Sequence, residues 1–368
     1  MKVLHLLTTS VDHGGVLSVI RNLSEGVAPV ENTEHFLWVN ERFEQVREPQ
    51  LGLRTTASDP KGRAAGSIYR GVVDLLRLLR SERFDVLHSH DRRDFYIGAV
   101  VAFLTRRKLV STFHFYSERR GWFRFLSRLP WVYPTWLTPN MVRYYGIEPV
   151  PGRDWTVPDP CSERFFRTEM RPIEQEFSAE RKLKLLGVGM LIEWKGWHVL
   201  LEAMGALEEE VRACIEVEIV GKASQTEAGF AYERRLVEML EGLDLADSVR
   251  ISGFVPDVTE TLLEADWFVL PSVNEPCSVA LSEALACGKP AIATRSGGSL
   301  DTVIDGKTGF LFEVGDAAGL AELLDGIVRG EKRISATAEE IRDSVKNRAA
   351  SEVARQFCEI YGAVAPNP

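Results

Sequence analysis

Short apolar runs alternate along the sequence with longer segments in which apolar residues recur every three or four positions. The short runs are typical of buried strands, and the longer spacing is typical of helices that pack one face against a core. Their regular alternation predicts βαβ units, in which helices connect the strands of a parallel sheet. In the first half, the predicted strands cover residues 3–7, 36–39, 85–88, 109–114, 136–138 and 155–157, and the predicted helices cover 16–25, 68–80 and 95–104.

A second series of the same kind follows a polar stretch at residues 171–181. The pattern predicts two Rossmann-like, doubly wound α/β domains, at residues 1–165 and 166–345, followed by a C-terminal helical segment at 346–368. Ligands of such folds bind at the carboxyl ends of the strands, so we expect the active site in a cleft between the domains. The second series has predicted strands at 182–187, 215–220, 249–252, 267–271 and 291–294, and helices at 197–207, 232–243, 257–264, 279–287 and 317–328.

Length and composition agree with two soluble domains, since the chain has 368 residues, 45% apolar and 26% charged. The sequence contains no apolar stretch of about 18 residues and begins with too short an apolar run for a signal peptide. Five scattered cysteines without a CxxC pair favour a reducing cytoplasm over a disulfide framework.

Charge is distributed unevenly along the chain. The formal net charge is −9, which argues against a dedicated nucleic-acid binder. Residues 1–160 nevertheless contain 22 basic and 17 acidic side chains, so this part carries +5 and the remainder −14. An anionic partner is therefore compatible with the first half.

The segment from Trp267 to Pro290 carries the most informative chemistry. A strand is followed by a loop with Glu275, and a helix starting near Ser278 contains Glu283 in its second turn. Helix N-termini present unpaired N–H groups and partial positive charge, which suits phosphate. Two carboxylates beside such a helix end can hold sugar and ribose hydroxyls around a diphosphate; solvated helix-end acids are the alternative interpretation.

The same segment resembles the signature of retaining glycosyltransferases of the GT-B class, the family-4 or group 1 type. That signature reads Glu-Pro-Phe-Gly-x-x-x-x-Glu-Ala, and here Cys277 and Ser278 replace its Phe-Gly. The resemblance implies that Glu283 binds the nucleotide ribose and that Glu275 contacts the donor sugar. It also implies a GT-B fold, a nucleotide-sugar donor carrying UDP or GDP, transfer with retention, and a C-terminal helix that crosses back to the first domain.

A second block, residues 187–197, is similar to the family motif Gly-Arg-Leu-x-x-x-Lys-Gly. The resemblance implies that Lys195 binds a donor phosphate as a point charge. The family's phosphate-binding arginine is Met190 in this chain, which removes one of two cations expected to stabilise a departing diphosphate. Reduced activity or a substitute base is therefore expected.

Further segments follow in family order. The segment 249–255 resembles one that packs against the nucleotide base, and residues 295–298 and 305–311 resemble glycine-containing turns of the family. Across all these blocks, the expected donor-binding residues are Gly15, Gly189, Lys195, Gly253, Phe254, Val255, Glu275, Cys277, Ser278, Val279 and Glu283.

In the first half, His13-Gly14-Gly15 follows the first predicted strand and looks like the family loop that approaches the donor phosphate. His88 and His90 lie in a segment that resembles Asp-Val-x-His-x-His, whose histidines are more often structural than catalytic. His114 belongs to a Thr-x-His segment, and the resemblance places it near the reacting sugar. The expected catalytic residues are thus Glu275, His114 and Lys195.

Residues 119–131 interleave arginines with large aromatic side chains. Such a basic amphipathic element can lie on anionic headgroups with its aromatics at the interface. An ordinary helix with its apolar face in the core is the alternative. The residues expected on this acceptor or membrane side are His13, Arg119, Arg120, Trp122, Arg124 and Arg128.

Missing motifs narrow the choice of function. The sequence lacks Gly-x-Gly-x-x-Gly after the first predicted strand, a P-loop, a Gly-x-Ser-x-Gly turn and an Asp-x-Asp metal motif. The absent Asp-x-Asp motif favours a metal-independent reaction without a resident cofactor. The family resemblance implies a glycosyltransferase acting in polysaccharide or glycoconjugate synthesis on a glycan, lipid-linked or small-molecule acceptor. A sugar-nucleotide epimerase or phosphorylase of related architecture, and a sugar-nucleotide-binding assembly partner that has lost turnover, remain alternatives.

Overall fold

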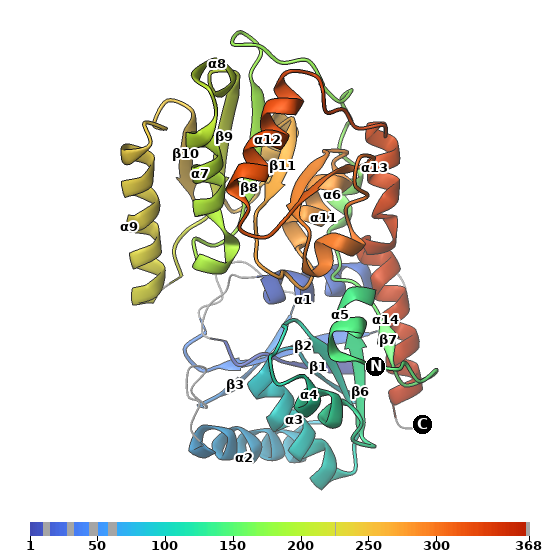
Figure 1. The fold of residues 1–368 in the computed structure, drawn as a ribbon. Helices are drawn as coiled ribbons and strands as arrows, with labels where there is room; N and C mark the ends of the chain where they lie inside the picture. The colour runs from blue at the N-terminus through green and yellow to red at the C-terminus, as the bar shows by residue number, and fades with distance from the viewer. Residues whose placement is uncertain (10–14, 28–32, 44–50, 58–64, 225, 366–368) are drawn as a thin grey trace. The chain divides into compact units, whose positions relative to one another are not determined.

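The computed structural model describes residues 1–9, 15–27, 33–43, 51–57, 65–224 and 226–365 (Figure 1). The chain folds into two compact units. The first unit combines residues Met1–Glu163 with Asn347–Pro368, and the second comprises Arg164–Lys346. No helix within the described ranges is long and apolar enough to cross a membrane.

The first unit is built on a seven-stranded parallel sheet with strand order β3-β2-β1-β4-β5-β6-β7. The order reverses direction between β1 and β4, which is the place where ligands bind in open α/β sheets. The strands are β1 (Lys2–Leu6), β2 (Glu34–Asn40), β3 (Gly52–Thr56), β4 (Val86–Ser89), β5 (Leu109–Phe113), β6 (Val132–Trp136) and β7 (Trp155–Thr156).

Helices cover both faces of this sheet. Val3, Val86 and Val110 pack with side chains of the C-terminal helix α14 and of α1, whereas Gly98 of α3 approaches Leu6 and Leu109 on the other face. The helices of this unit are α1 (Gly15–Val27), α2 (Ala65–Ser81), α3 (Arg92–Thr105), α4 (Arg120–Ser127), α5 (Pro139–Tyr145) and α14 (Ala350–Val364); α6 (Glu163–Phe166) and η3 (Lys346–Arg348) lie at the two boundaries between the units.

The second unit contains a six-stranded parallel sheet with the order β10-β9-β8-β11-β12-β13. Its strands are β8 (Leu183–Val188), β9 (Ile215–Val220), β10 (Val249–Gly253), β11 (Trp267–Leu270), β12 (Ala291–Thr294) and β13 (Gly309–Phe312). Its helices are α7 (Trp197–Ala206), α8 (Glu209–Arg212), α9 (Glu227–Gly242), α10 (Thr259–Glu264), α11 (Val279–Ala286), α12 (Ala317–Val328) and α13 (Ala338–Ser344), with 3-10 turns η1 (Glu193–Lys195) and η2 (Gly297–Asp301).

Local chemistry explains where several of these elements begin and end. All residues of β11 are buried, which matches its uninterrupted apolar sequence and its central place in a parallel sheet. The side chain of Ser278 accepts a hydrogen bond from the Leu281 N–H and so starts α11. Thr337 and Glu340 form a reciprocal capping box at the start of α13.

The strand predicted at residues 136–138 is wrong in position. The strand there is β6, Val132–Trp136, and Thr138 instead caps α5 by accepting from the Met141 N–H. Pro134 lies inside β6 and made this stretch look irregular in the sequence. β3 escaped prediction because its residues are mostly polar and half-buried, with no apolar run.

The packing of α1 against α14 yields a stability prediction. A methyl group at Gly26 of α1 would overlap the backbone carbonyl of Ala350 at the start of α14. We expect Gly26→Ala to lower the free energy of unfolding by about 1–3 kcal/mol because the helices cannot approach as closely. Chemical denaturation monitored by circular dichroism measures this loss.

Gly66→Ala is the matched control, because a methyl group at Gly66 of α2 meets nothing within 4 Å. This change is expected to be neutral or to stabilise the protein by up to about 1 kcal/mol. Equal effects of the two substitutions would show that close helix packing at Gly26 does not limit stability.

Candidate functional site

Lys195 and Glu275 form a buried ion pair at the carboxyl edge of the second sheet. Lys195 ends the η1 turn that follows β8, and Glu275 lies in the loop between β11 and α11. Because β8 and β11 are neighbours in the sheet, these two loops meet. The Lys195 Nζ atom lies 2.6 Å from Glu275 Oε2, and the residues are only 8% and 9% exposed.

Close backbone contacts hold the two loops to each other and to the η2 turn that follows β12. The Val273 N–H donates to the Trp194 carbonyl at 2.7 Å, and the Gly298 N–H donates to the Glu275 carbonyl at 2.7 Å. Gly196 has φ +72°, and a side chain there would overlap the carbonyl of Pro271. The positive φ and this close approach both require glycine, which explains the Lys-Gly pair in the sequence.

Helix α11 begins beside this ion pair. Cys277 and Ser278, the residues that replace the family's Phe-Gly, are both buried, and Ser278 is the N-cap. Val279 is the first helical residue. The N-terminus of an eight-residue helix therefore adds partial positive charge close to Lys195 and Glu275.

Glu283 lies in the same helix but takes no part in the ion pair. Its carboxylate has no hydrogen bond or ion pair with any residue that the structure describes. Burial raises the pKa of Glu283 to about 7, with Arg164 opposing the rise and Asp257 adding to it. A partly buried carboxyl group without a partner is suited to receive a hydrogen-bonding ligand.

The remaining predicted donor residues follow other strands of the same sheet. Gly189 comes directly after β8, and its N–H donates to the Val220 carbonyl at 3.0 Å. Gly253 ends β10 with φ +72°, and its carbonyl accepts from the Gly221 N–H at 2.7 Å. Phe254 and Val255 continue from there, with the Phe254 ring 48% exposed. Parallel strands thus place all of these loops at one edge.

Sequence reasoning missed Lys222, a cation at this same edge. Lys222 follows β9, and its carbonyl accepts from the Leu191 N–H at 3.0 Å, next to Met190. The Lys222 ammonium lies 5.0 Å from the centre of the Phe254 ring. Met190 itself is 41% exposed. Lys222 lies beside Met190, the position of the family's arginine, because β8 and β9 are neighbours in the sheet. The spacing of the two residues in the sequence does not reveal this proximity.

Of the site residues predicted in the first unit, the structure describes Gly15 and His114. Gly15 is exposed at the start of α1, just beyond the carboxyl end of β1. His13 lies outside the described residues. His114 follows β5 and is enclosed, with Nε2 3.2 Å from His90 Nδ1 and Nδ1 3.3 Å from Asp159 Oδ1. Both ring nitrogens of His114 therefore face protein groups.

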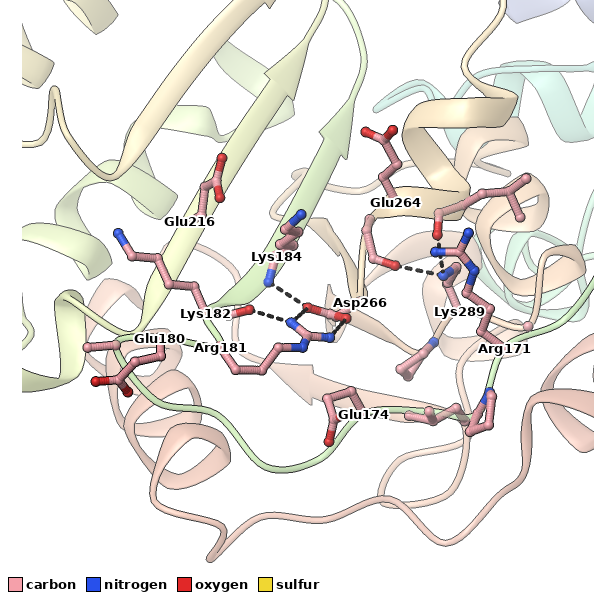
Figure 2. A pocket seen from close by; sticks show the side chains of 17 residues that line it. Arg171, Glu174, Glu180, Arg181, Lys182, Lys184, Glu216, Glu264, Asp266 and Lys289 are labelled. Carbon is pink, nitrogen blue, oxygen red and sulfur yellow. Dashed lines mark hydrogen bonds and ion pairs between the residues drawn. The ribbon is translucent and has the colours of Figure 1, made fainter.

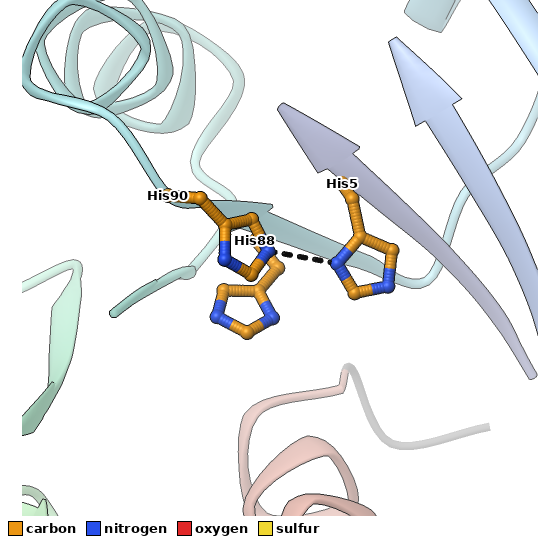
Figure 3. Close-up of side chains that lie close together, drawn as sticks. All are labelled: His5, His88 and His90. Carbon is orange, nitrogen blue, oxygen red and sulfur yellow. Dashed lines mark hydrogen bonds between the residues drawn. The ribbon is translucent and has the colours of Figure 1, made fainter. Parts of the chain in front are cut away.

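His88 and His90 lie in a buried cluster that also contains His5 (Figure 3). Ligand atoms of these three residues lie within 4.8 Å of one another, close enough for a metal ion to be considered. Each ring nitrogen, however, already has a protein partner, and His88 bonds Tyr361 at 2.8 Å and Thr112 at 2.7 Å. Burial lowers the pKa of all three well below 6.5, so the rings are neutral at pH 7.

The basic aromatic element is helix α4 with its flanking residues. Trp122 and Phe125 are 49% and 60% exposed, beside exposed Arg119, Arg120 and Arg124. Arg128 differs from these arginines because it pairs with Asp154 at 2.6 Å and donates to the Glu148 carbonyl at 2.6 Å. Its role is therefore to hold the loop that precedes β7, while the other three arginines face outwards.

A cavity of about 490 Å³ opens at the opposite edge of the second sheet, where its strands begin (Figure 2). Two of its basic side chains are bonded within the protein. Arg181 pairs with Asp266 at 2.6 Å, and Lys289 donates to the carbonyls of Leu263 and Ala265. This edge is distant in the fold from Lys195 and Glu275, so the cavity is not part of the candidate site.

Two models of known protein families match the chain. The model described as Glycosyl transferases group 1 matches residues 170–348, and the model Glycosyltransferase Family 4 matches residues 13–145. The chain belongs to the group 1 glycosyltransferases. This confirms the family predicted from the residues around Glu275 and Lys195.

Curated relatives of this chain include N-acetyl-alpha-D-glucosaminyl L-malate synthase of Bacillus anthracis, 28% identical over 54% of this chain and 50% of the relative. A putative colanic acid biosynthesis glycosyltransferase, WcaL of Salmonella typhimurium, is 33% identical over 48% of this chain and 41% of the relative. The matches thus span about half the length of these relatives.

Among solved structures, HepE of Anabaena in complex with UDP and glucose superimposes with a TM-score of 0.77. The two chains are 16% identical, and the match covers 98% of this chain and 99% of HepE. At this identity the likeness concerns the fold. Together with the two parallel-sheet units, it confirms that this chain has the predicted GT-B fold.

The buried carboxyl of Glu283 predicts a pH-dependent difference between the wild type and Glu283→Gln. The folded pKa of about 7 exceeds the ordinary value of 4.5, so the native state retains a proton that the unfolded chain loses. This contribution to stability is present below pH 4.5 and is lost as pH rises towards and through 7. We expect Glu283→Gln to gain up to about 3 kcal/mol relative to the wild type between pH 5 and pH 8.

Urea unfolding at pH 5, 6.5 and 8 measures this difference. Glu202→Gln, at an exposed position on α7, is the control and should show the same pH dependence as the wild type. A constant difference between Glu283→Gln and the wild type over this range would contradict the assignment.

Proposed function

We propose that this protein transfers a sugar from a UDP- or GDP-linked donor to a hydroxyl acceptor with retention of configuration, in polysaccharide or glycoconjugate synthesis. The observation that carries the proposal is the buried Lys195–Glu275 pair at the carboxyl edge of β8 and β11, beside the start of α11. Family membership and the UDP found with HepE support a nucleotide-sugar donor.

In this proposal the second unit holds the donor. Lys195 would stabilise negative charge on the diphosphate as the bond to the sugar breaks, assisted by the α11 N-terminus. Glu275 would accept hydrogen bonds from sugar hydroxyls, and Glu283 from the ribose. Before the donor binds, the ion pair lets Lys195 and Glu275 neutralise each other's charge. This matters because the two residues are only 8% and 9% exposed, and an unpaired charge would be unfavourable there.

Lys222 is the proposed substitute for the arginine that Met190 replaces. It provides positive charge at the same edge, and its ammonium group lies over the ring of Phe254, where the family resemblance places the nucleotide base. No metal ion is required in this scheme, because Lys195, Lys222 and the helix end supply the positive charge. His114 stays a proposed contact of the reacting sugar.

A sugar-nucleotide-binding partner without turnover is the second candidate, and Met190 favours it because a cation is missing. The two proposals differ in what Glu275 does. A transferase requires Glu275 for transfer, whereas an assembly partner would bind its partner without it.

Substitution of Lys195 tests the transferase proposal. Lys195→Met is expected to lower kcat/KM at least about 100-fold, as for other groups that stabilise developing charge. Donors are first chosen by thermal shift with UDP- and GDP-sugars, since ligands that bind the native state raise Tm. Transfer is then followed by release of the nucleoside diphosphate in the presence of an acceptor.

The double variant Lys195→Met, Glu275→Gln is the folding control, because it leaves no uncompensated buried charge. If it recovers the Tm of the wild type but not its activity, the loss comes from chemistry. Stabilisation by no nucleotide, or full transfer by Lys195→Met, would contradict the proposal.

We further propose that the first unit contacts an anionic membrane or a lipid-linked acceptor through α4. Exposed Trp122 and Phe125 can enter the headgroup region while Arg119, Arg120 and Arg124 bind lipid phosphates. In this proposal the protein would be held peripherally at a cytoplasmic membrane face. Arg128 is excluded from the surface because it pairs with Asp154.

We expect replacement of Arg119, Arg120 and Arg124 by glutamate to weaken binding to anionic vesicles at least tenfold, because the new charges repel the lipid phosphates. Co-sedimentation with phosphatidylglycerol-containing vesicles at low salt measures the effect. The control changes Arg70, Arg77 and Arg80 of α2 to glutamate, which alters net charge equally on another helix of the same unit. Equal loss in both variants would show non-specific attraction only.

A further inference from the structure

The indole ring of Trp194 lies against the ammonium group of Lys195 in the second unit. The Lys195 Nζ atom is 4.7 Å from the centre of the Trp194 ring, within the distance of about 6 Å at which a ring face attracts a cation. The same Nζ atom is 2.6 Å from Glu275 Oε2. Lys195 therefore has two stabilising contacts of different kinds, a negative carboxylate and an uncharged ring.

Trp194 differs from Trp197, the tryptophan that follows three positions later. Trp197 is fully buried, and its Nε1–H donates to the Met190 carbonyl at 3.0 Å. Trp194 is 39% exposed, and its indole N–H donates to no residue that the structure describes. Burial and hydrogen bonding of the side chain therefore explain the tryptophan at position 197, whereas the ring at position 194 is engaged with the ammonium of Lys195.

The backbone fixes the Trp194 ring beside the lysine. Trp194 is the middle residue of the η1 turn, and its carbonyl accepts from the Val273 N–H at 2.7 Å. Side chains of consecutive residues in a 3-10 turn point about 120° apart, so the Lys195 stem has to bend to bring its ammonium over the ring. A methyl group at Gly189 would lie 3.3 Å from Lys195 Cε, which shows that the stem is closely packed in this position.

Glu275 leaves most of the hydrogen-bonding capacity of Lys195 unused. An ammonium group has three N–H donors, and among the described residues the Glu275 carboxylate is the one hydrogen-bond acceptor of Lys195 Nζ. The ring of Trp194 has no net charge, so it attracts the ammonium without neutralising it. An anionic ligand can thus bind Lys195 while the ring stays in place.

We propose that Trp194 is a positioning residue that holds the charged end of Lys195 at the carboxyl edge of the second sheet when Glu275 releases it. This role rests on the proposed glycosyl transfer and adds a residue to it. Glu275 releases Lys195 as its carboxylate accepts hydrogen bonds from the donor sugar, and the ring then keeps the ammonium directed at the diphosphate. An ammonium at 8% exposure is unfavourable without a partner, and the ring is a partner that the donor does not displace.

The first test follows Lys195 itself and requires no substrate. In the full-length protein labelled with ¹³C-lysine, the ring current of Trp194 should move the ε-CH₂ resonance of Lys195 upfield of the position of an exposed lysine, and Lys195→Met identifies that resonance. The shift should be lost in Trp194→Leu and retained in Glu275→Gln, whose amide removes the negative charge but not the ring. An unshifted resonance in the wild type, or loss of the shift in Glu275→Gln, would overturn the proposal.

The second test measures transfer with the UDP- or GDP-sugar that thermal shift selects. Trp194→Leu is expected to lower kcat about tenfold and to change KM for the donor less than twofold, because the ring positions the charge that Lys195 supplies as the bond to the sugar breaks. Trp194→Phe keeps an aromatic face and should retain at least about a third of the wild-type kcat. An unchanged kcat in Trp194→Leu, or equal losses in both variants, would contradict the role.

Fluorinated tryptophans incorporated at position 194 separate electrostatic positioning from a purely structural role. Each added fluorine draws electron density from the ring face and weakens its attraction for a cation, while the shape of the ring changes little. We expect kcat to fall stepwise with the number of fluorines, whereas a structural ring would leave kcat unchanged. Phe230→Leu, at an exposed position on α9, is the matched control for loss of an exposed aromatic ring in the same unit and should transfer like the wild type.

These measurements distinguish the role of Trp194 from the proposed function. If no donor supports transfer, the proposed function fails, and the Lys195 resonance still decides whether the ring holds the ammonium. If Lys195→Met abolishes transfer but Trp194→Leu does not lower kcat, the proposed function stands and the positioning role is wrong. A higher KM for the acceptor at unchanged kcat in Trp194→Leu would assign the ring to acceptor stacking and would also overturn the role.

Discussion

The ion pair between Lys195 and Glu275 is the interaction on which the architecture of the second unit's site depends. Two opposite charges at 8–9% exposure remain together only if the backbone holds their loops within hydrogen-bonding distance. The glycine at position 196 and the bond from Gly298 to the Glu275 carbonyl supply that constraint. The sheet order then determines the rest, because neighbouring β8, β9 and β11 deliver Lys195, Lys222 and Glu275 to one edge.

The first unit buries three histidine side chains as neutral groups and not as an ion pair. Its buried polar groups include the rings of His5, His88 and His90, which are neutral at pH 7, and each nitrogen of these three rings is hydrogen-bonded to another ring or to a hydroxyl group. Neutral groups tolerate burial far better than unpaired charges. Acid should therefore destabilise this unit more than the second, because the unfolded histidines bind protons that the folded rings exclude.

Much of this organisation could be predicted from the sequence. Apolar periodicity located most strands and helices, and the spacing of Glu275, Glu283 and Lys195 indicated a phosphate- and sugar-binding edge. Apolar periodicity did not locate β3 and misplaced β6, because polar residues interrupt the apolar run in β3 and Pro134 interrupts it in β6. The proposed role of Lys222 depends on the adjacency of β8 and β9, which no local sequence pattern encodes. Arg128 resembled its neighbours in sequence, and only the position of Asp154 shows that it faces inwards.

The discontinuous first unit has a consequence for synthesis of the protein. Its core includes Phe357 and Tyr361 of α14, and Tyr361 bonds the buried ring of His88. The second unit, at 164–346, is contiguous in sequence and leaves the ribosome complete while this part of the first unit is still missing. Until residues near 364 emerge, α14 cannot cover its part of the first sheet. The first unit therefore cannot be completed before the whole second unit has been synthesised, although most of its residues come first in the sequence.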